Sequence, residues 1–217
     1  MVTRNPQKTT AAVVVAHPDD ETLWAGGTIL NHPRWRWCII TLCRADDADR
    51  APRFHKALNA LKAEGAMGKL DDGADQNPLD HETVQKEILS HLPQRNFDLI
   101  VTHDPKGEYT RHRRHEETSL GVCKLIKDGV ISTRHLWTFA YEDGGKKYLP
   151  RARENVDFLF KLPRDIWIRK YEIITNVYGF PKTSFEARTT PRKEAFRCFN
   201  SSAEIEKLLF ERRENLQ

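Results

Sequence analysis

The chain has 217 residues, of which 39% are hydrophobic and 30% are charged. This composition excludes a disordered chain and fits one domain with its own hydrophobic core. Thirty-five Lys and Arg residues against 31 Asp and Glu residues give a net charge of +4, an excess too small to indicate nucleic-acid binding. Because no apolar stretch is long enough for a membrane helix and no apolar signal region lies near the start, we expect a cytoplasmic protein without a membrane span.

The cysteine pattern gives no sign of a disulfide framework. The four cysteines show no Cys-x-x-Cys spacing, and a chain of this length does not depend on disulfides for stability. We therefore expect a reduced compartment and mostly packed thiols at Cys38, Cys43, Cys123 and Cys198.

Strand and helix patterns alternate along the first 140 residues. Short apolar, β-branched runs, typical of strands covered on both faces, occur at 11–16, 37–42, 98–102 and 131–140. Helical patterns fall between them, at 21–30, from Pro52 to a stop at Gly65, from a cap at Asp80 through Leu92, and at 113–127. Strands joined by helical crossovers predict an α/β fold: a Rossmann-like open, mostly parallel twisted sheet with helices on both faces.

The pattern changes after residue 140. An exposed turn is expected at 144–147, an edge strand at 156–162, a helix at 167–178 and a final helix capped by Ser201 and Glu204. We predict a single domain over residues 1–217, with a core of about 11–140 and a C-terminal strand and helix extension of about 141–217.

Four ionisable residues follow the first predicted strand: His17, Asp19, Asp20 and Glu21. Here His17 and Asp20 can offer N and O ligands to a zinc-like ion, while Asp19 remains free to act as a base. The acidic groups could instead cap the next helix, since carboxylates favour the positive end of its dipole. This cluster alone leaves both interpretations open.

A second polar cluster follows the fourth predicted strand. His103 and Asp104 come directly after it, and His112 and His115 lie at the start of the next predicted helix, on one face. One of these two histidines could complete a tetrahedral site with the first cluster, leaving a position for water, while the other acts as a donor or acid. A solvated basic helix face is the alternative. Because both clusters meet at the ligand-binding edge of one sheet, the metal site is favoured.

Two motifs resemble those of a known family. The stretch AHPDDETLWAGG at 16–27 resembles the opening motif of the LmbE/PIG-L family of zinc-dependent N-acetylglucosaminyl deacetylases, and THDPKGEYTRHRRHEE at 102–117 resembles its H-x-x-H motif. The resemblance extends over about residues 11–140 and implies Zn²⁺ as the cofactor. It implies five site residues: His17, Asp20 and His115 as zinc ligands, Asp19 as general base, and a protonated His112 assisting the tetrahedral intermediate.

The same resemblance implies weaker, substrate-side contacts. Arg53 and Asp72 are expected to bind substrate hydroxyl or phosphate groups, and Tyr109 is expected either to donate to the oxyanion or to pack the loop. Arg111 stands where many family members have glycine. Together with the basic residues at 106, 113 and 114 it suggests an anionic substrate, although a solvated surface explains these charges equally well.

The sequence therefore predicts a zinc-dependent hydrolase that removes an acyl group, expected to be acetyl, from an amino sugar or a related small conjugate. An anionic amino-sugar conjugate is one such small-molecule amide substrate. Two alternatives stay open. One is a metal-dependent hydrolase of a non-sugar amide or a phosphoester, the latter needing a second metal and His103 and Asp104 as spare ligands. The other is a non-catalytic binding domain for an anionic partner. The oligomeric state is also open, so a homo-oligomer remains an option.

Overall fold

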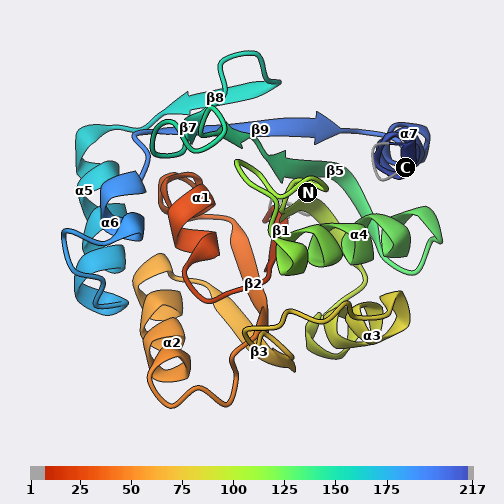
Figure 1. Ribbon diagram of the computed structural model, residues 1–217, viewed down its shortest axis with the longest axis horizontal. Coiled ribbons are helices and arrows are strands. Elements are labelled where there is room, and N and C mark those ends of the chain that lie inside the picture. Colours follow the sequence, from red (N-terminus) through yellow and green to blue (C-terminus); the bar gives the residue numbers. More distant parts are fainter. Residues whose placement is uncertain (1–7, 215–217) are drawn as a thin grey trace, which may run out of the picture.

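A seven-stranded sheet forms the centre of the molecule, with the strand order β3-β2-β1-β4-β5-β9-β8 (Figure 1). The computed structural model describes the backbone of residues 8–214 and the side chains of residues 8–210. The parallel strands are β1 (Thr10–Val15), β2 (Arg36–Cys43), β3 (Glu64–Leu70), β4 (Asn96–Thr102) and β5 (Ser132–Phe139). The antiparallel strands are β9 (Lys193–Phe199) and β8 (Phe158–Lys161), and a separate pair is formed by β6 (Tyr141–Glu142) and β7 (Arg151–Ala152).

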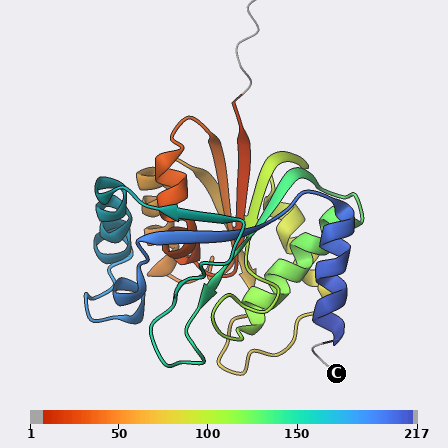
Figure 2. The same ribbon diagram turned by 90° about the horizontal axis from the view of Figure 1, so that it is seen from above.

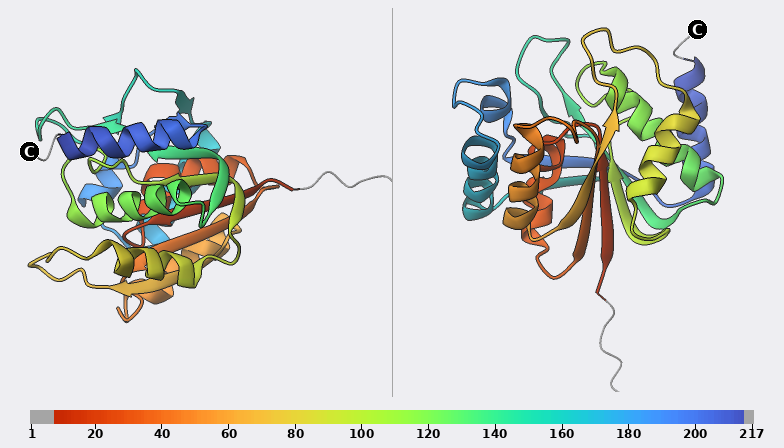
Figure 3. Two further views of the ribbon diagram at one scale, coloured as in Figure 1. Left: turned by 90° about the vertical axis from the view of Figure 1, so that its right-hand side faces the viewer. Right: turned by 90° about the horizontal axis from the view of Figure 1, so that it is seen from below.

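Helices cover both faces of this sheet, as Figure 2 shows. One face carries α1 (Asp20–Asn31), α2 (Arg50–Leu61), α5 (Arg164–Glu172), a π-helical segment (Ile173–Val177) and α6 (Phe185–Thr189). The other carries α3 (His81–His91), α4 (Arg113–Lys127) and α7 (Ser202–Glu214), which lie side by side in Figure 3. The predicted α/β class is therefore confirmed. No helix in the described part of the chain has the length and apolarity to cross a bilayer.

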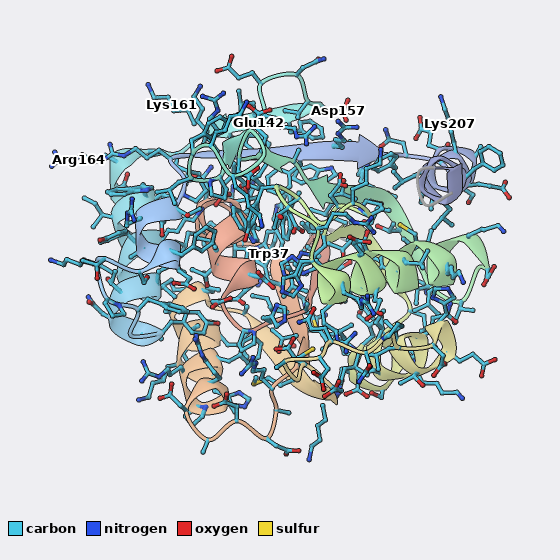
Figure 4. All side chains as sticks on the ribbon, viewed as in Figure 1. Trp37, Glu142, Asp157, Lys161, Arg164 and Lys207 are labelled. Atoms are coloured by element: carbon cyan, nitrogen blue, oxygen red, sulfur yellow. The ribbon has the colours of Figure 1, made fainter. Side chains whose placement is uncertain are left out.

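The first strand shows why its sequence is apolar throughout. Successive side chains of a strand point to opposite faces, so the residues at 11, 13 and 15 enter one core and those at 12 and 14 enter the other. All five are fully buried. Trp37 is also interior, whereas the charged side chains labelled in Figure 4, such as Lys161 and Lys207, project from the periphery. The cysteines are free thiols, three of them buried: Cys38, Cys43 and Cys123.

The largest departure from the predicted elements concerns Gly65. We expected it to stop the second helix, but α2 already ends at Leu61, with Lys62 in the left-handed conformation at φ 56°. Gly65 instead lies inside β3, where a Cβ atom would collide with the carbonyl oxygen of Ile39. Glycine is thus needed because two backbones approach closely. Strand β3 escaped prediction because its sequence, EGAMGKL, contains no β-branched residue. Strand β9 and helix α6 were also not predicted.

The C-terminal elements agree better with expectation. The predicted edge strand corresponds to β8, at the end of the sheet. The predicted helix at 167–178 is divided between α5 and the π-helical segment. At the start of α7, the Ser201 hydroxyl accepts from the Glu204 N–H at 3.3 Å, and the Glu204 carboxylate accepts from the Asn200 N–H at 2.6 Å. Helix α7 packs against α4, and its residue Ile205 is buried in the core on that side.

A buried ion pair in the extension anchors α1. Glu194 on β9 accepts hydrogen bonds from the backbone N–H groups of Gly27 and Thr28, both at 2.7 Å. The ammonium group of Lys170 donates to the same carboxylate at 2.6 Å, and both side chains are fully buried. Because α1 begins at the carboxyl end of β1, this contact fixes the helix whose first residues belong to the polar cluster.

We predict that Glu194→Ala destabilises the fold by about 3–5 kcal/mol, because it leaves the Lys170 ammonium buried without its partner. Chemical denaturation followed by circular dichroism measures the change. The control is Glu154→Ala, since Glu154 pairs with Lys193 on the surface with 83% of its side chain exposed. An equal loss of stability in both variants would show that Glu194 does not anchor α1.

Candidate active site

The two polar clusters of the sequence meet at one edge of the sheet. Strands β1 and β4 are parallel neighbours, with Val14 opposite Thr102, so their carboxyl ends lie side by side. The turn that follows β1 carries His17 and Asp19, and the loop that follows β4 leads to His115 on α4. Segments almost a hundred residues apart in the chain thereby share one site, at the edge where ligands collect in open α/β sheets.

Three donor atoms converge on a single point. Nδ1 of His17 lies 3.1 Å from Nε2 of His115 and 3.2 Å from Oδ2 of Asp20. The remaining separation, between Nε2 of His115 and Oδ2 of Asp20, is 3.4 Å. A tetrahedral zinc site with bonds of about 2.0–2.1 Å has ligand atoms about 3.3–3.4 Å apart. The three atoms therefore fit three vertices of such a site and leave the fourth open.

Hydrogen bonds on the far side of each ring set the histidine tautomers. Nδ1 of His115 lies 2.7 Å from the Glu108 carboxylate, and Nε2 of His17 lies 3.1 Å from the Asp72 carboxylate. Despite burial, hydrogen bonds and charges from neighbouring cations lower the pKa of each of these carboxyl groups to about 2, so each can only accept. Both rings therefore donate outward, and the nitrogen that faces the shared point is the one available to bind a cation.

Glu108 is a central residue that the sequence analysis missed. Its carboxylate also contacts Nδ1 of His103, whose Nε2 accepts the backbone N–H of Ala16 at 2.9 Å. One fully buried carboxylate thus holds two imidazole rings, His103 and His115, which stack with centroids 3.9 Å apart. The one signal in the sequence is its position within the loop that leads to the H-x-x-H motif.

The acidic surroundings of His17 favour a positive charge at the shared point. Burial lowers the pKa of His17, but its hydrogen bonds to Asp20 and Asp72 and their charges outweigh burial and raise this pKa to about 10. The pKa of Asp20 lies far below its usual range, because the neighbouring histidines overcome the opposing effect of burial. A bound cation would satisfy the same carboxylates.

Asp19 stands beside the three donors and is not one of them. Its backbone has φ 122°, a conformation that residues with side chains rarely adopt, and its N–H donates to the Glu21 carboxylate at 3.0 Å. The Asp19 carboxylate lies 3.5 Å from the Arg50 guanidinium. Burial and the charges of Asp20 and Glu21 raise the pKa of Asp19 well above its usual value. The turn therefore presents a separate carboxylate next to the donor cluster.

His112 packs against both histidine donors. Its ring stacks on His115 with centroids 4.2 Å apart and meets the edge of His17 at 5.0 Å. Its Nδ1 is buried without a hydrogen-bond partner in the structure. Burial and then the two neighbouring histidines lower the pKa of His112 to about 4, so the ring is neutral near pH 7, in contrast to the protonated form we expected. His112 with His17 and His115, and His103 with Asp20 and His115, form two further groups with metal-ligand spacing.

A cleft of about 520 Å³ opens over these side chains. The predicted substrate contacts Asp72 and Tyr109 line it, although Asp72 is engaged with His17 and with Arg44, at 2.7 Å. The structure does not bring Arg53 to this lining: Arg53 bonds to Asp49 at 2.7 Å. Its neighbour Arg50, one turn earlier on α2, lines the cleft instead. Sequence reasoning had no means to choose between the two arginines.

The basic residues expected to select an anionic substrate also point elsewhere. Nε and Nη2 of Arg111 each donate to the Glu116 carboxylate at 2.9 Å, and 68% of the Arg111 side chain is exposed. Arg114 is buried and pairs with Glu117 at 2.5 Å. Neither arginine lines the cleft. The arginines that do line it, and that are placed to contact an anionic substrate, are Arg44 and Arg50.

Comparison with known proteins identifies the family. A family model described as GlcNAc-PI de-N-acetylase, PIG-L, matches residues 12–126 of the 217, and the chain belongs to this family. The resemblance read from the two motifs is thereby confirmed. The uncharacterised protein L374 of Acanthamoeba polyphaga mimivirus is 24% identical over an alignment of 144 residues. The alignment covers 60% of this chain and 61% of that protein. The match thus spans about three fifths of this curated relative.

Several solved structures share the fold. The N,N'-diacetylchitobiose deacetylase of Pyrococcus horikoshii has a TM-score of 0.62 at 14% identity, covering 89% of this chain and 85% of its own. The zinc-inhibited form of the teicoplanin deacetylase Orf2 gives 0.62 at 12% identity, covering 89% and 99%. GalB, the 4-carboxy-2-hydroxymuconate hydratase of Pseudomonas putida KT2440, gives 0.61 at 13% identity, covering 88% and 95%. Because a hydratase and deacetylases share this fold, fold likeness alone does not select the reaction.

We predict that Glu108→Gln weakens zinc binding by about 10- to 100-fold, because an amide cannot accept from both imidazole N–H groups. Competition with a chromophoric chelator measures the affinity, and circular dichroism verifies folding. The control is Glu142→Gln, a half-exposed residue bonded to Arg151 at 3.2 Å on the surface. Unchanged affinity in a folded Glu108→Gln protein would remove Glu108 from the support of the site.

Proposed function

We propose that the protein is a zinc-dependent deacetylase that removes an acetyl group from an N-acetylated amino sugar or a related small conjugate. Membership of the PIG-L family and the deacetylases among its structural neighbours support a deacetylase-type hydrolase. The observation that carries the proposal is the convergence of His17, Asp20 and His115 on one point, at 3.1–3.4 Å, beside the separate carboxylate of Asp19.

In this proposal the metal is held by Nδ1 of His17, Oδ2 of Asp20 and Nε2 of His115. When bound, zinc lowers the pKa of a coordinated water to about 7 and polarises the acyl carbonyl. The residues around it fit this role, because each ring bonds a carboxylate through its outer nitrogen and Asp20 is ionised. A metal ion would displace the proton that His17 carries on its inner nitrogen. Asp72 and Glu108 act as positioning residues that hold the two rings from behind.

Asp19 is the proposed general base. It accepts a proton from the attacking water at its carboxylate and later returns that proton to the leaving amine, so no side chain becomes acylated. The hydrogen bond from its N–H to Glu21 fixes the turn that aims it. Arg50, 3.5 Å away, opposes the neighbouring negative charges and helps to keep a fraction of Asp19 ionised.

His112 and Tyr109 are the proposed stabilisers of the oxyanion. A neutral His112 can offer one N–H hydrogen bond, and Tyr109, which also lines the cleft, can offer its phenolic O–H. Hydrogen bonds of this kind, directed at the developing charge in a cleft that excludes water, stabilise the transition state more than the ground state.

The geometry favours a single metal over the two that a phosphoesterase would need. Of the two spare ligands considered for a second ion, His103 has both ring nitrogens engaged, with Ala16 and with Glu108, and Asp104 accepts the backbone N–H of Lys106 at 2.8 Å. Within residues 8–210, the two groups with metal-ligand spacing, His17–His112–His115 and Asp20–His103–His115, both use His115, so they lie around the same point and favour one ion there. This arrangement supports hydrolysis of an amide by one ion.

The metal assignment predicts about one zinc per chain after loading and desalting, measured by elemental analysis. His115→Ala is expected to lose this zinc, because two remaining ligands hold the ion weakly. The matched control is His135→Ala, an exposed histidine on β5 that should retain it. Two metals per chain would favour a phosphoesterase, and full zinc occupancy in His115→Ala would refute the ligand set.

The base assignment predicts that Asp19→Asn retains zinc but slows deacetylation by about 10²- to 10⁴-fold, the usual cost of removing a general base. Release of free amine is measured over a panel of N-acetylated sugars, sugar nucleotides and non-sugar amides. Asp46→Asn, an exposed carboxylate paired with Lys69, is the control and should match the unaltered enzyme. Full turnover in Asp19→Asn would contradict the role of Asp19, and no amine from any acetylated sugar would contradict the proposed substrate class.

A further inference from the structure

The C-terminal extension supplies one wall of the cleft. The hydroxyl of Tyr178 donates to the Glu21 carboxylate at 2.7 Å, next to the proposed base. Phe180 lies beneath the Arg50 guanidinium, 4.5 Å from its ring centroid. Helix α6 follows and contacts the π-helical segment, and its first residue, Phe185, lines the cleft itself. These aromatic residues lie outside the segment that the family model matches, so they are features of this chain and not of the family motif.

Phe185 continues a row of aromatic rings that starts at the donor cluster. The indole N–H of Trp24 donates to Asp20 at 3.3 Å, and the Trp24 ring lies 5.4 Å from the ring of Tyr109. Tyr109 in turn lies 5.7 Å from Phe185. Exposure increases along the row, from 1% at Trp24 through a half-buried Tyr109 to 40% at Phe185. The row therefore runs from the floor of the cleft to its mouth.

The position of Phe185 is fixed by its own short helix. The Ser184 hydroxyl caps α6 by accepting the Ala187 N–H at 3.2 Å, and Ala187 and Thr189 are buried beneath it. A fixed, largely apolar ring that stays exposed at a cleft mouth is a common feature of ligand sites, because a bound ring can cover it. The acetamide itself would lie deeper, near Asp19, so the ligand part that reaches Phe185 is a different part of the substrate.

We propose that Phe185 is the stacking contact for a second ring of the substrate. This ring is bonded to the amino sugar, which the reaction releases as the free amine, and not to the acetyl group. The ring offers Phe185 a flat, partly apolar face, which either another pyranose or an aryl group provides. This inference rests on the proposed deacetylase function and assigns to Phe185, a residue outside the matched family segment, the recognition of N-acetylated amino sugars that carry a ring substituent. Phe185 is then the residue that distinguishes them from the free monosaccharide.

Calorimetric titration of the zinc-loaded Asp19→Asn protein tests this without turnover. The ligands are N-acetylglucosamine, N,N'-diacetylchitobiose and 4-nitrophenyl N-acetyl-β-glucosaminide, and the last two distinguish a sugar from an aryl second ring. Adding Phe185→Ala is expected to weaken binding of at least one two-ring ligand by about fivefold to tenfold, from the lost apolar contact, and to leave the monosaccharide unchanged. Phe185→Tyr should restore binding, because it keeps the aromatic face.

The matched control is Phe210→Ala, which removes an exposed phenylalanine on α7 with 59% of its surface accessible. It should leave all three affinities unchanged. Equal weakening of all ligands by Phe185→Ala, no weakening, or no binding of either two-ring ligand would overturn the proposal. Zinc content and amine release from other substrates would then still support the proposed function, so the two failures can be told apart.

Discussion

The site depends on one electrostatic constraint: two imidazole nitrogens and one carboxylate oxygen face each other at 3.1–3.4 Å. Without a positive charge between them such an arrangement is repulsive, and in a buried setting the repulsion is only weakly screened. Neighbouring groups maintain it, because the ionised carboxylates of Asp72 and Glu108 keep the ring protons on the outer side. The arrangement therefore requires a positive charge at the shared point, carried by a proton on His17 or, in the proposed function, by a bound metal ion.

Residues far away in the chain keep that arrangement rigid. Asp20 begins α1, and Glu194 from β9 binds two N–H groups in the middle of this helix. Tyr178, from the extension, binds Glu21 and so supports the unusual backbone of Asp19. The extension thus contributes to the architecture of the site as well as to the wall of the cleft. Fold likeness to a hydratase shows that such local contacts, more than the sheet itself, must decide the reaction.

The sequence was informative where chemistry and periodicity are local. Apolar runs predict the parallel strands at 11–16 and 98–102, and because the carboxyl ends of parallel strands share an edge, the sequence also predicts that both histidine clusters meet there. It was silent where tertiary contacts decide. Glu108 turns inward only because its loop adopts φ 44° there, and Arg111 is drawn to Glu116 and away from the cleft. Gly65 was predicted to stop a helix, because its actual role depends on the close approach of the Ile39 backbone, which the sequence does not reveal.

X-ray absorption fine structure at the zinc edge of the loaded protein tests the central claim most directly, because it reports the atoms bound to the ion. The account predicts two imidazole nitrogens and a carboxylate oxygen at about 2.0–2.2 Å, with one further oxygen and no sulfur. The imidazole signal should fall in His17→Ala. A shell with three imidazoles would place His112 among the ligands in place of Asp20, and a shell without imidazole would contradict the site altogether.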